Sequence, residues 1–229
     1  MSQEILEKRQ QQVLYDEKWK KFLRRTWLFR WIPFVDFALA AGSMATGNVN
    51  ENSDFDVIVG ARIGRIFTAR FFAVLSFGLL GWRRRKLSHK ELASDQICLN
   101  HFVTERSFKL SPPYNDYWEA LYKNLVPVFG SQEKIHQFWQ ANEPWLGEKI
   151  NYKDDLRHLH RTSAWKKKAY EWLLSGSLGD KLESWLKKIQ VRRIEKSLKK
   201  FPPGFEPRIR YGNDELEFHP DTARTLNYL

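Results

Sequence analysis

The stretch GSMATGNVNENSDFDVIV, from Gly42 to Val59, decides the fold expected for this chain. It begins with a Gly-Ser pair, continues through a polar loop, and ends in an apolar run preceded by two aspartates, Asp54 and Asp56. Like charges at positions i and i+2 repel each other at the start of a strand. We therefore expect positive charge nearby that offsets them.

These residue types suit a site that holds a metal and phosphate. Side chains alternate between the faces of a strand, so Asp54 and Asp56 point to the same side, about 6.5–7 Å apart along the backbone. Paired carboxylates bind hard divalent cations, which prefer oxygen ligands. At Gly42 and Ser43 the backbone can approach a ligand closely, and N–H groups with a serine hydroxyl can hold phosphate oxygens. Together these features indicate phosphoryl transfer.

The order of these features resembles the nucleotidyltransferase superfamily related to DNA polymerase beta. The residues that carry the resemblance are Gly42, Ser43, Gly47, Ser53, Asp54, Asp56 and Val59. The resemblance implies an enzyme that moves a nucleoside monophosphate from an NTP, such as ATP, to an acceptor and releases pyrophosphate. It implies that Gly42, Ser43 and Ser53 bind the nucleotide. It also implies that Asp54 and Asp56 bind Mg²⁺, or alternatively Mn²⁺. A plainer interpretation of the same residues is an Asp-rich turn that caps a strand.

A third carboxylate would complete the expected site. The family usually places it on the strand that corresponds to Gln96–Thr104, and that segment has no acid in its middle. We predict that Asp95, at its start, is the third metal ligand and catalytic acid; Glu105 is a remoter candidate. If Asn100 stands in this position instead, the site loses a charge and a general base, and the protein would bind nucleotide without turnover.

The rest of the chain predicts an α+β protein, with a palm-like mixed sheet and flanking helices followed by a mostly helical region. We expect a nucleotidyltransferase core at residues 1–112 and a helical bundle with a short C-terminal hairpin at residues 113–229. The expected elements are helices at 3–27 and 63–80, strands at 34–41, from 56, and at 96–104, helices over 114–200, a hairpin in RIRYGNDELEF and a last helix in HPDTARTLNYL. The tryptophans beyond residue 113 are expected to form the core of the bundle.

Composition restricts the class of protein. With 42% hydrophobic residues the chain is not disordered, and its net charge of +11 favours polyanionic partners without choosing among them. A single cysteine, Cys98, permits no disulfide within the chain, and the N-terminus is polar, so we expect a cytoplasmic protein. The apolar run Ile66–Trp82 contains Arg70 and is too short to span a membrane, so we interpret it as a buried helix.

Three functional hypotheses follow. The first is a Mg²⁺-dependent nucleotidyltransferase whose acceptor is a small molecule, a protein or an RNA. The second is a catalytically inactive nucleotide- or RNA-binding protein on the same fold, favoured by the missing third acid and the net charge of +11. The third is a membrane-surface or protein-interaction module that uses Ile66–Trp82 and the basic cluster Arg83–Lys86. We consider membrane binding the least favoured of these.

Overall fold

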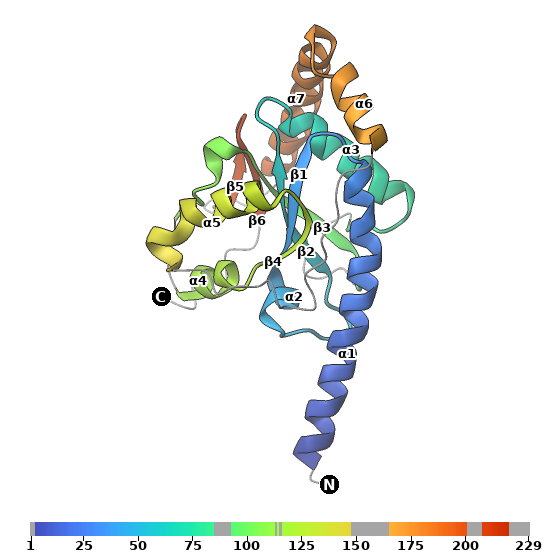
Figure 1. Cartoon of the computed structure of the whole chain (residues 1–229), viewed down its shortest axis with the longest axis vertical. Helices are drawn as coiled ribbons and strands as arrows, with labels where there is room; N and C mark the ends of the chain where they lie inside the picture. Colours follow the sequence, from blue (N-terminus) through green and yellow to red (C-terminus); the bar gives the residue numbers. More distant parts are fainter. Residues whose placement is uncertain are drawn as a thin grey trace.

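The structure is a computed structural model that describes residues 3–84, 93–112, 114, 116–147, 165–200 and 208–219. Within these residues the chain has an α+β fold built on a six-stranded mixed sheet with the strand order β4-β1-β2-β3-β6-β5 (Figure 1). The strands are β1 Val35–Ala40, β2 Phe55–Ala61, β3 Ile97–Val103, β4 Val126–Gly130, β5 Arg208–Tyr211 and β6 Glu215–His219. The helices are α1 Gln3–Thr26, α2 Gly42–Thr46, α3 Ile66–Leu79, α4 Asp116–Lys123, α5 Gln132–Leu146, α6 Trp165–Leu173 and α7 Ser177–Leu198, with 3₁₀ turns at Trp27–Trp31 and Glu105–Ser107.

One parallel pair of strands lies at the centre of the sheet. β2 runs parallel to β3, whereas β1 is antiparallel to both β2 and β4, and β6 is antiparallel to both β3 and β5. Parallel strands need a crossover, and α3 supplies it between β2 and β3. The strands that border the Asp-x-Asp segment are therefore interior strands of the sheet.

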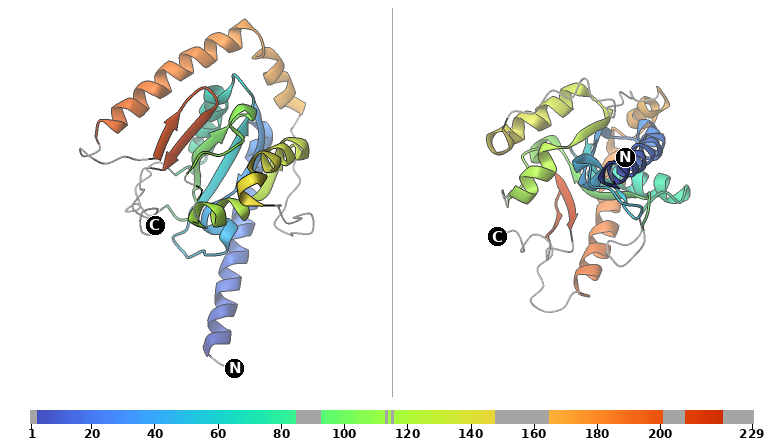
Figure 2. Two further views of the ribbon diagram at one scale, coloured as in Figure 1. Left: turned by 90° about the vertical axis from the view of Figure 1, so that its left-hand side faces the viewer. Right: turned by 90° about the horizontal axis from the view of Figure 1, so that it is seen from below.

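Helices cover both faces of the sheet (Figures 1 and 2). On one face, Phe55, Val57 and Val59 of β2 pack in a core with buried residues of α1, α3 and α7. On the other face, Ile58 of β2 packs in a second core with buried residues of α4 and α5. Because side chains alternate along a strand, Asp56 lies on the same face as Ile58, the face covered by α4 and α5.

Two glutamates, Glu183 and the buried Glu171, join the C-terminal helices to the rest of the fold. Glu183 of α7 accepts hydrogen bonds from the backbone N–H groups of Phe67 and Thr68, at 2.9 and 2.8 Å, which are otherwise unpaired donors in the first turn of α3. Glu171 of α6 accepts from the backbone N–H of Phe34 at 2.7 Å. Phe34 has a φ of 61°, which is strained for a non-glycine residue, and this bond helps to hold it.

Most of the predicted elements are confirmed. The structure contains the helices expected at 3–27 and 63–80, the first three strands, and the C-terminal hairpin, which turns at residues 212–214. The last predicted helix, in HPDTARTLNYL, lies almost entirely outside the described residues.

The region after residue 112 differs from the prediction in two ways. β4, β5 and β6 belong to the same sheet as β1, β2 and β3, so the sheet extends across the boundary predicted at residue 112. The tryptophans are also not all in a core: Trp118 and Trp139 are buried, whereas Trp165, Trp172 and Trp185 are 74%, 81% and 57% exposed. α6 and α7 form a helical hairpin over one end of the sheet rather than a closed bundle, so their outer faces remain in solvent (Figure 2).

The apolar helix α3 packs inside the fold, as predicted for Ile66–Trp82, and Ile66, Ala69, Ala73 and Phe77 are buried. Among the described residues, no helix combines the length and the apolar character needed to cross a membrane.

Candidate nucleotide and metal site

The Gly-Ser turn and the Asp-x-Asp segment lie against each other. α2 begins at Gly42, directly after β1, and the N–H of Ala41 donates to the carbonyl oxygen of Asp56 at 2.9 Å. Gly42 has a φ of 61°, and a Cβ at this position would lie 2.3 Å from Oδ2 of Asp56. Only a glycine therefore allows the turn to approach this carboxylate so closely.

The two aspartates converge with one neighbour from β3. Ligand atoms of Asp54, Asp56 and Cys98 all lie within 4.8 Å of one another. Nδ2 of Asn100 donates to Oδ1 of Asp56 at 3.3 Å. Oδ2 of Asp54 pairs with a guanidinium nitrogen of Arg84 at 2.6 Å. Arg84 supplies the positive charge that the sequence led us to expect beside the two acids.

A bulge in β3 shapes this part of the site. Asp56 pairs with Cys98, but Ile58 pairs with His101, so Leu99 and Asn100 of β3 stand opposite Val57 of β2. Such an extra residue disturbs the strict alternation of side chains. Asn100 can thus contact Asp56 while His101, the next residue, faces the same side of the sheet as Ile58.

Burial and neighbouring charges shift the pKa values of Asp56, Cys98 and Arg84. Burial and the nearby charge of Asp54 raise the pKa of Asp56 to about 7. Burial, followed by the charge of Asp56, raises the pKa of the Cys98 thiol well above its usual value, so the thiol is protonated at neutral pH. Burial tends to lower the pKa of Arg84, but Asp54 raises it overall. A divalent cation at the two carboxylates would relieve their repulsion.

Asp95, the predicted third acid, is not part of this cluster. Its carboxylate pairs with Nζ of Lys18 at 2.9 Å and with Nζ of Lys21 at 2.8 Å, both from α1, and its carbonyl oxygen accepts from Arg25. Burial tends to raise the pKa of Asp95, but the hydrogen bonds from Lys21 and Lys18 lower it overall. Asp95 thus links α1 to the start of β3 through its two lysine partners. Asn100 of β3 lies beside Asp56 instead. Glu105 pairs with Lys134 at 2.5 Å.

The two predicted serines have different surroundings. Ser43 is a half-buried residue in the first turn of α2, next to Gly42. Oγ of Ser53 accepts from the backbone N–H of Asn50 at 2.9 Å, and its carbonyl oxygen accepts from Nζ of Lys18. The hydroxyl of Ser53 thus stabilises the loop before β2, and its contact with nucleotide remains a prediction.

An open cleft lies at the other end of α2. It has a volume of about 490 Å³ and is lined by Lys8, Gln11, Gln12 and Tyr15 of α1 and by Ala45, Thr46 and Gly47. Volumes of this size accommodate small-molecule ligands. Since α2 has only five residues, the cleft is about 8 Å from the Gly42 turn.

Sequence reasoning missed two members of the site. Arg84 belongs to the basic cluster Arg83–Lys86, which the third hypothesis assigns to a membrane-surface or protein-interaction module. Its pairing with Asp54 spans 30 residues of sequence. Cys98 stands two residues before Asn100 on β3, and this alternation is the one signal that could have placed both beside Asp56.

Comparisons of the chain with family models, curated proteins and solved structures found no match.

Proposed function

We propose that this protein is a Mg²⁺-dependent nucleotidyltransferase on a palm-like fold, which transfers a nucleoside monophosphate from an NTP to an acceptor and releases pyrophosphate. The observation that carries the proposal is the approach of Gly42 to Asp56, where a Cβ would lie 2.3 Å from the carboxylate. This contact brings a potential phosphate-binding turn and a pair of metal-binding acids into one site.

The residues of the site fit a hard divalent cation. Asp54 and Asp56 offer carboxylate oxygens, the ligand type that Mg²⁺ prefers, and the neighbouring thiol of Cys98 is protonated and therefore a poor ligand. When bound, Mg²⁺ would neutralise charge on the phosphates during transfer.

The chain's own residues would orient the nucleotide. The backbone N–H groups at Gly42 and Ser43 open α2 and are available to phosphate oxygens, and the small size of Gly42 keeps this turn against Asp56. Arg84 holds Asp54 at 2.6 Å and is long enough to move its guanidinium to a phosphate once a cation binds Asp54. The cleft beyond α2 is a candidate place for the base or the acceptor, which we propose to be a small molecule, a protein or an RNA.

A second candidate function is nucleotide binding without turnover, and a specific contact favours it. Asn100 occupies the place beside Asp56 where a third carboxylate would be expected, with its Nδ2 3.3 Å from Oδ1 of Asp56. An amide carries no negative charge for a second cation and is not a general base at neutral pH. In this case the same residues would bind the NTP and its cation, but no nucleotidyl transfer would follow.

One experiment separates these candidates. The purified chain is incubated with Mg²⁺ and each of the four NTPs labelled at the α-phosphate, with a panel of small-molecule, protein and RNA acceptors. Pyrophosphate release and transfer of label are measured, and NTP affinity is measured in parallel. We expect Mg²⁺-dependent transfer that Asp54→Asn lowers by a factor on the order of 100 or more.

Asp95→Asn is the matched control, because it removes an equally charged acid that lies outside the cluster. Its activity should stay within a few-fold of the unchanged chain. Tight, Mg²⁺-dependent NTP binding without transfer to any acceptor would favour the binding module. Absence of both binding and transfer, or full activity of Asp54→Asn, would reject the proposed site.

A further inference from the structure

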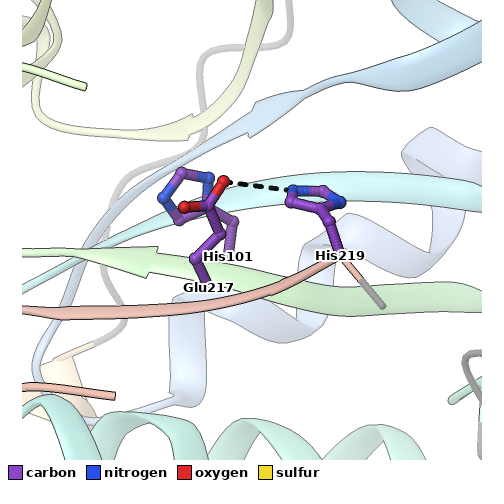
Figure 3. A group of neighbouring side chains, drawn as sticks. All are labelled: His101, Glu217 and His219. Carbon is purple, nitrogen blue, oxygen red and sulfur yellow. Dashed lines mark ion pairs between the residues drawn. The ribbon is translucent and has the colours of Figure 1, made fainter. Parts of the chain in front are cut away.

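A second group of potential metal ligands lies on the same face of the sheet, one strand beyond β3. His101 comes from β3, and Glu217 and His219 come from β6; ligand atoms of all three lie within 4.8 Å of one another. His101 stands directly opposite Glu217 in the antiparallel pair, and Glu217 and His219 are two residues apart on one strand. The register of the sheet therefore brings the three side chains together (Figure 3).

The outer atoms of two of these side chains are held by neighbours. Nε2 of His101 lies 3.2 Å from Oε1 of Glu215, and since a carboxylate only accepts hydrogen bonds, this nitrogen carries the proton. Oε1 of Glu217 accepts from Nε of Arg208 at 2.6 Å. Oε1 of Glu217 also lies 3.6 Å from Nε2 of His219. The remaining atoms of the two side chains are Nδ1 of His101 and Oε2 of Glu217.

Those two atoms lack hydrogen bonds. The side chains of His101 and Glu217 are 2% and 0% exposed, and neither Nδ1 nor Oε2 has a hydrogen-bond partner among the described residues. A buried polar atom without a partner costs about 1–3 kcal/mol, so such atoms in a native fold call for a physical explanation. A cation bound by these side chains would supply one.

We propose that His101, Glu217 and His219 bind a divalent transition-metal ion, with Zn²⁺ as the best fit. Two imidazoles and one carboxylate form a ligand set that suits Zn²⁺, whereas the carboxylates of Asp54 and Asp56 suit Mg²⁺. Glu215 behind His101 and Arg208 behind Glu217 are the kind of outer contacts that orient metal ligands. The proposal does not depend on the proposed nucleotidyl transfer.

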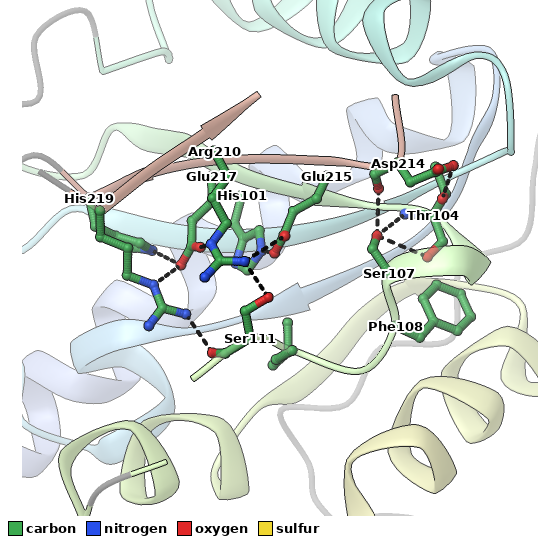
Figure 4. Close-up of polar contacts among 12 residues, drawn as sticks. His101, Thr104, Ser107, Phe108, Ser111, Arg210, Asp214, Glu215, Glu217 and His219 are labelled. Carbon is green, nitrogen blue, oxygen red and sulfur yellow. Dashed lines mark hydrogen bonds and ion pairs between the residues drawn. The ribbon is translucent and has the colours of Figure 1, made fainter. Parts of the chain in front are cut away.

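The alternative is an ion-pair network without metal, in which Arg208 and Arg210 neutralise Glu217. Nε of Arg210 lies 3.5 Å from Oε2 of Glu217, and its charge would repel a metal ion there. Arg210 has other partners, however: it donates to Oγ of Ser111 and lies 3.8 Å from Oε2 of Glu215 (Figure 4). It can thus leave Oε2 of Glu217 without becoming unpaired. The two interpretations differ in whether metal binds, which is measurable.

A metal at this place would fasten the C-terminal hairpin to the centre of the sheet. β5 and β6 come more than a hundred residues after β3 in the sequence. The hairpin joins the sheet through the pairing of β6 with β3. His101 is also adjacent to Asn100, which contacts Asp56, so a fixed His101 would help to hold the bulge in β3. The ion would be structural in its effect and would raise the free energy of unfolding.

The test uses the full chain carrying Asp54→Asn and Asp56→Asn, so that the carboxylate site cannot contribute. The protein is freed of metal with a chelator and titrated with Zn²⁺ and with Co²⁺ as a spectroscopic probe. We expect one equivalent of either metal, a visible Co²⁺ spectrum typical of nitrogen and oxygen ligands in a low-coordinate site, and an unfolding midpoint that rises by several degrees. Binding below one-fifth of an equivalent at micromolar metal would overturn the proposal, whatever the ligand variants do.

Ligand variants locate the metal. His219→Gln is chosen because His219 is the most exposed of the three, with 25% of its side chain exposed. The metal-free variant should therefore unfold as cooperatively as the protein with His219 in place. It should lose binding at least tenfold, and Glu217→Gln serves as a second variant. The control His136→Gln removes an exposed histidine on α5 and should leave binding unchanged. Equal Zn²⁺ affinity in His219→Gln and His136→Gln would also overturn the assignment.

Discussion

Two acidic pairs with the same spacing lie on one face of this sheet, and their surroundings give them opposite properties. Asp54 stands directly before β2 and Asp56 is its second residue, whereas Glu215 and Glu217 are the first and third residues of β6. Burial and Asp54 raise the pKa of Asp56 to about 7. Burial also acts to raise the pKa of Glu215, but the hydrogen bond with His101 and the charge of nearby arginines lower it overall.

The difference comes from the cations that the fold brings to each pair. Arg208 and Arg210 on β5 stand across from His219 and Glu217, so the register of the hairpin supplies two guanidinium groups to the glutamates. An Asp-x-Asp or Glu-x-Glu pattern therefore does not by itself indicate a metal site. The glutamate pair is balanced by two guanidinium groups. The aspartate pair is unbalanced by comparison, since the pKa of Asp56 is raised even though Arg84 pairs with Asp54.

The largest expected effect is the loss of stability when the balanced pair is broken. Glu217→Ala removes a fully buried carboxylate and leaves Arg208, with a side chain only 9% exposed, without its closest partner. Breaking a buried ion pair on one side costs about 3–5 kcal/mol of the free energy of unfolding. Urea unfolding of the metal-free protein at pH 7.5 measures this loss.

Glu51→Ala is a suitable control for that experiment, because Glu51 is an exposed acid in the loop before β2. Its free energy of unfolding should change by less than about 0.5 kcal/mol. A loss below 1 kcal/mol in Glu217→Ala would mean that the arginines find equivalent partners. The two acidic pairs would then not differ in the way described.

The next largest effect concerns pH and the unbalanced pair. In the unfolded chain the carboxyl of Asp56 has a pKa near 4, whereas in the fold it is about 7. Between these values the folded protein holds a proton that the unfolded chain has lost, so this group destabilises the fold as pH rises through that range. Asp56→Asn lacks this titration and should stabilise the metal-free protein at pH 8 by about 2 kcal/mol.

Thermal or urea unfolding of both proteins at pH 5 and pH 8, in a chelating buffer, tests this prediction. The unchanged chain should lose more stability between the two pH values than Asp56→Asn does. The same variant should bind Mg²⁺ and NTP poorly, so stability and binding should change in opposite directions. If the two proteins showed parallel pH profiles, the carboxyl of Asp56 would be ionised throughout, and the contrast with Glu215 would disappear.

The sequence predicts the first half of the fold better than the second, for physical reasons. Local sequence determines β1, α2 and β2, through the glycine that ends β1, the apolar runs and the Asp-x-Asp segment. These elements bring Gly42 to Asp56. Asp95 was chosen for its place at the start of a strand. Its partners Lys18 and Lys21 lie more than 70 residues away, and no local pattern indicates that pairing.

Long-range strand pairing explains the other differences. β4 is a five-residue strand with a proline, and it lies in a Trp-rich and Lys-rich region. The composition of that region predicts helices over 114–200, and so the strand is not predicted. The hairpin of β5 and β6 was visible in the sequence, but its pairing with β3 was not, and so the cluster of His101 with Glu217 was missed. The alternation of Glu215, Glu217 and His219 places three polar side chains on one face, and it was the available signal.

The smallest expected effect comes from Asn100→Asp, which adds a third carboxylate to Asp54 and Asp56. A third carboxylate beside Asp56 adds repulsion in the metal-free protein and should lower its free energy of unfolding by about 1 kcal/mol. The same charge should favour a bound cation and tighten Mn²⁺ binding about tenfold, which corresponds to about 1.4 kcal/mol. Titration followed by the Mn²⁺ electron paramagnetic resonance signal measures the affinity.

Asn100→Ala is the matched control, since it removes the hydrogen bond to Oδ1 of Asp56 without adding charge. Tighter Mn²⁺ binding in the aspartate variant alone would mean that charge, not the shape of the bulge, limits cation binding at this place. If both variants bound Mn²⁺ as the unchanged chain does, position 100 would lie outside the coordination sphere. A gain of nucleotidyl transfer in Asn100→Asp alone would show that the amide keeps an otherwise complete site in a binding role, because the two proteins differ there only by one ionisable group.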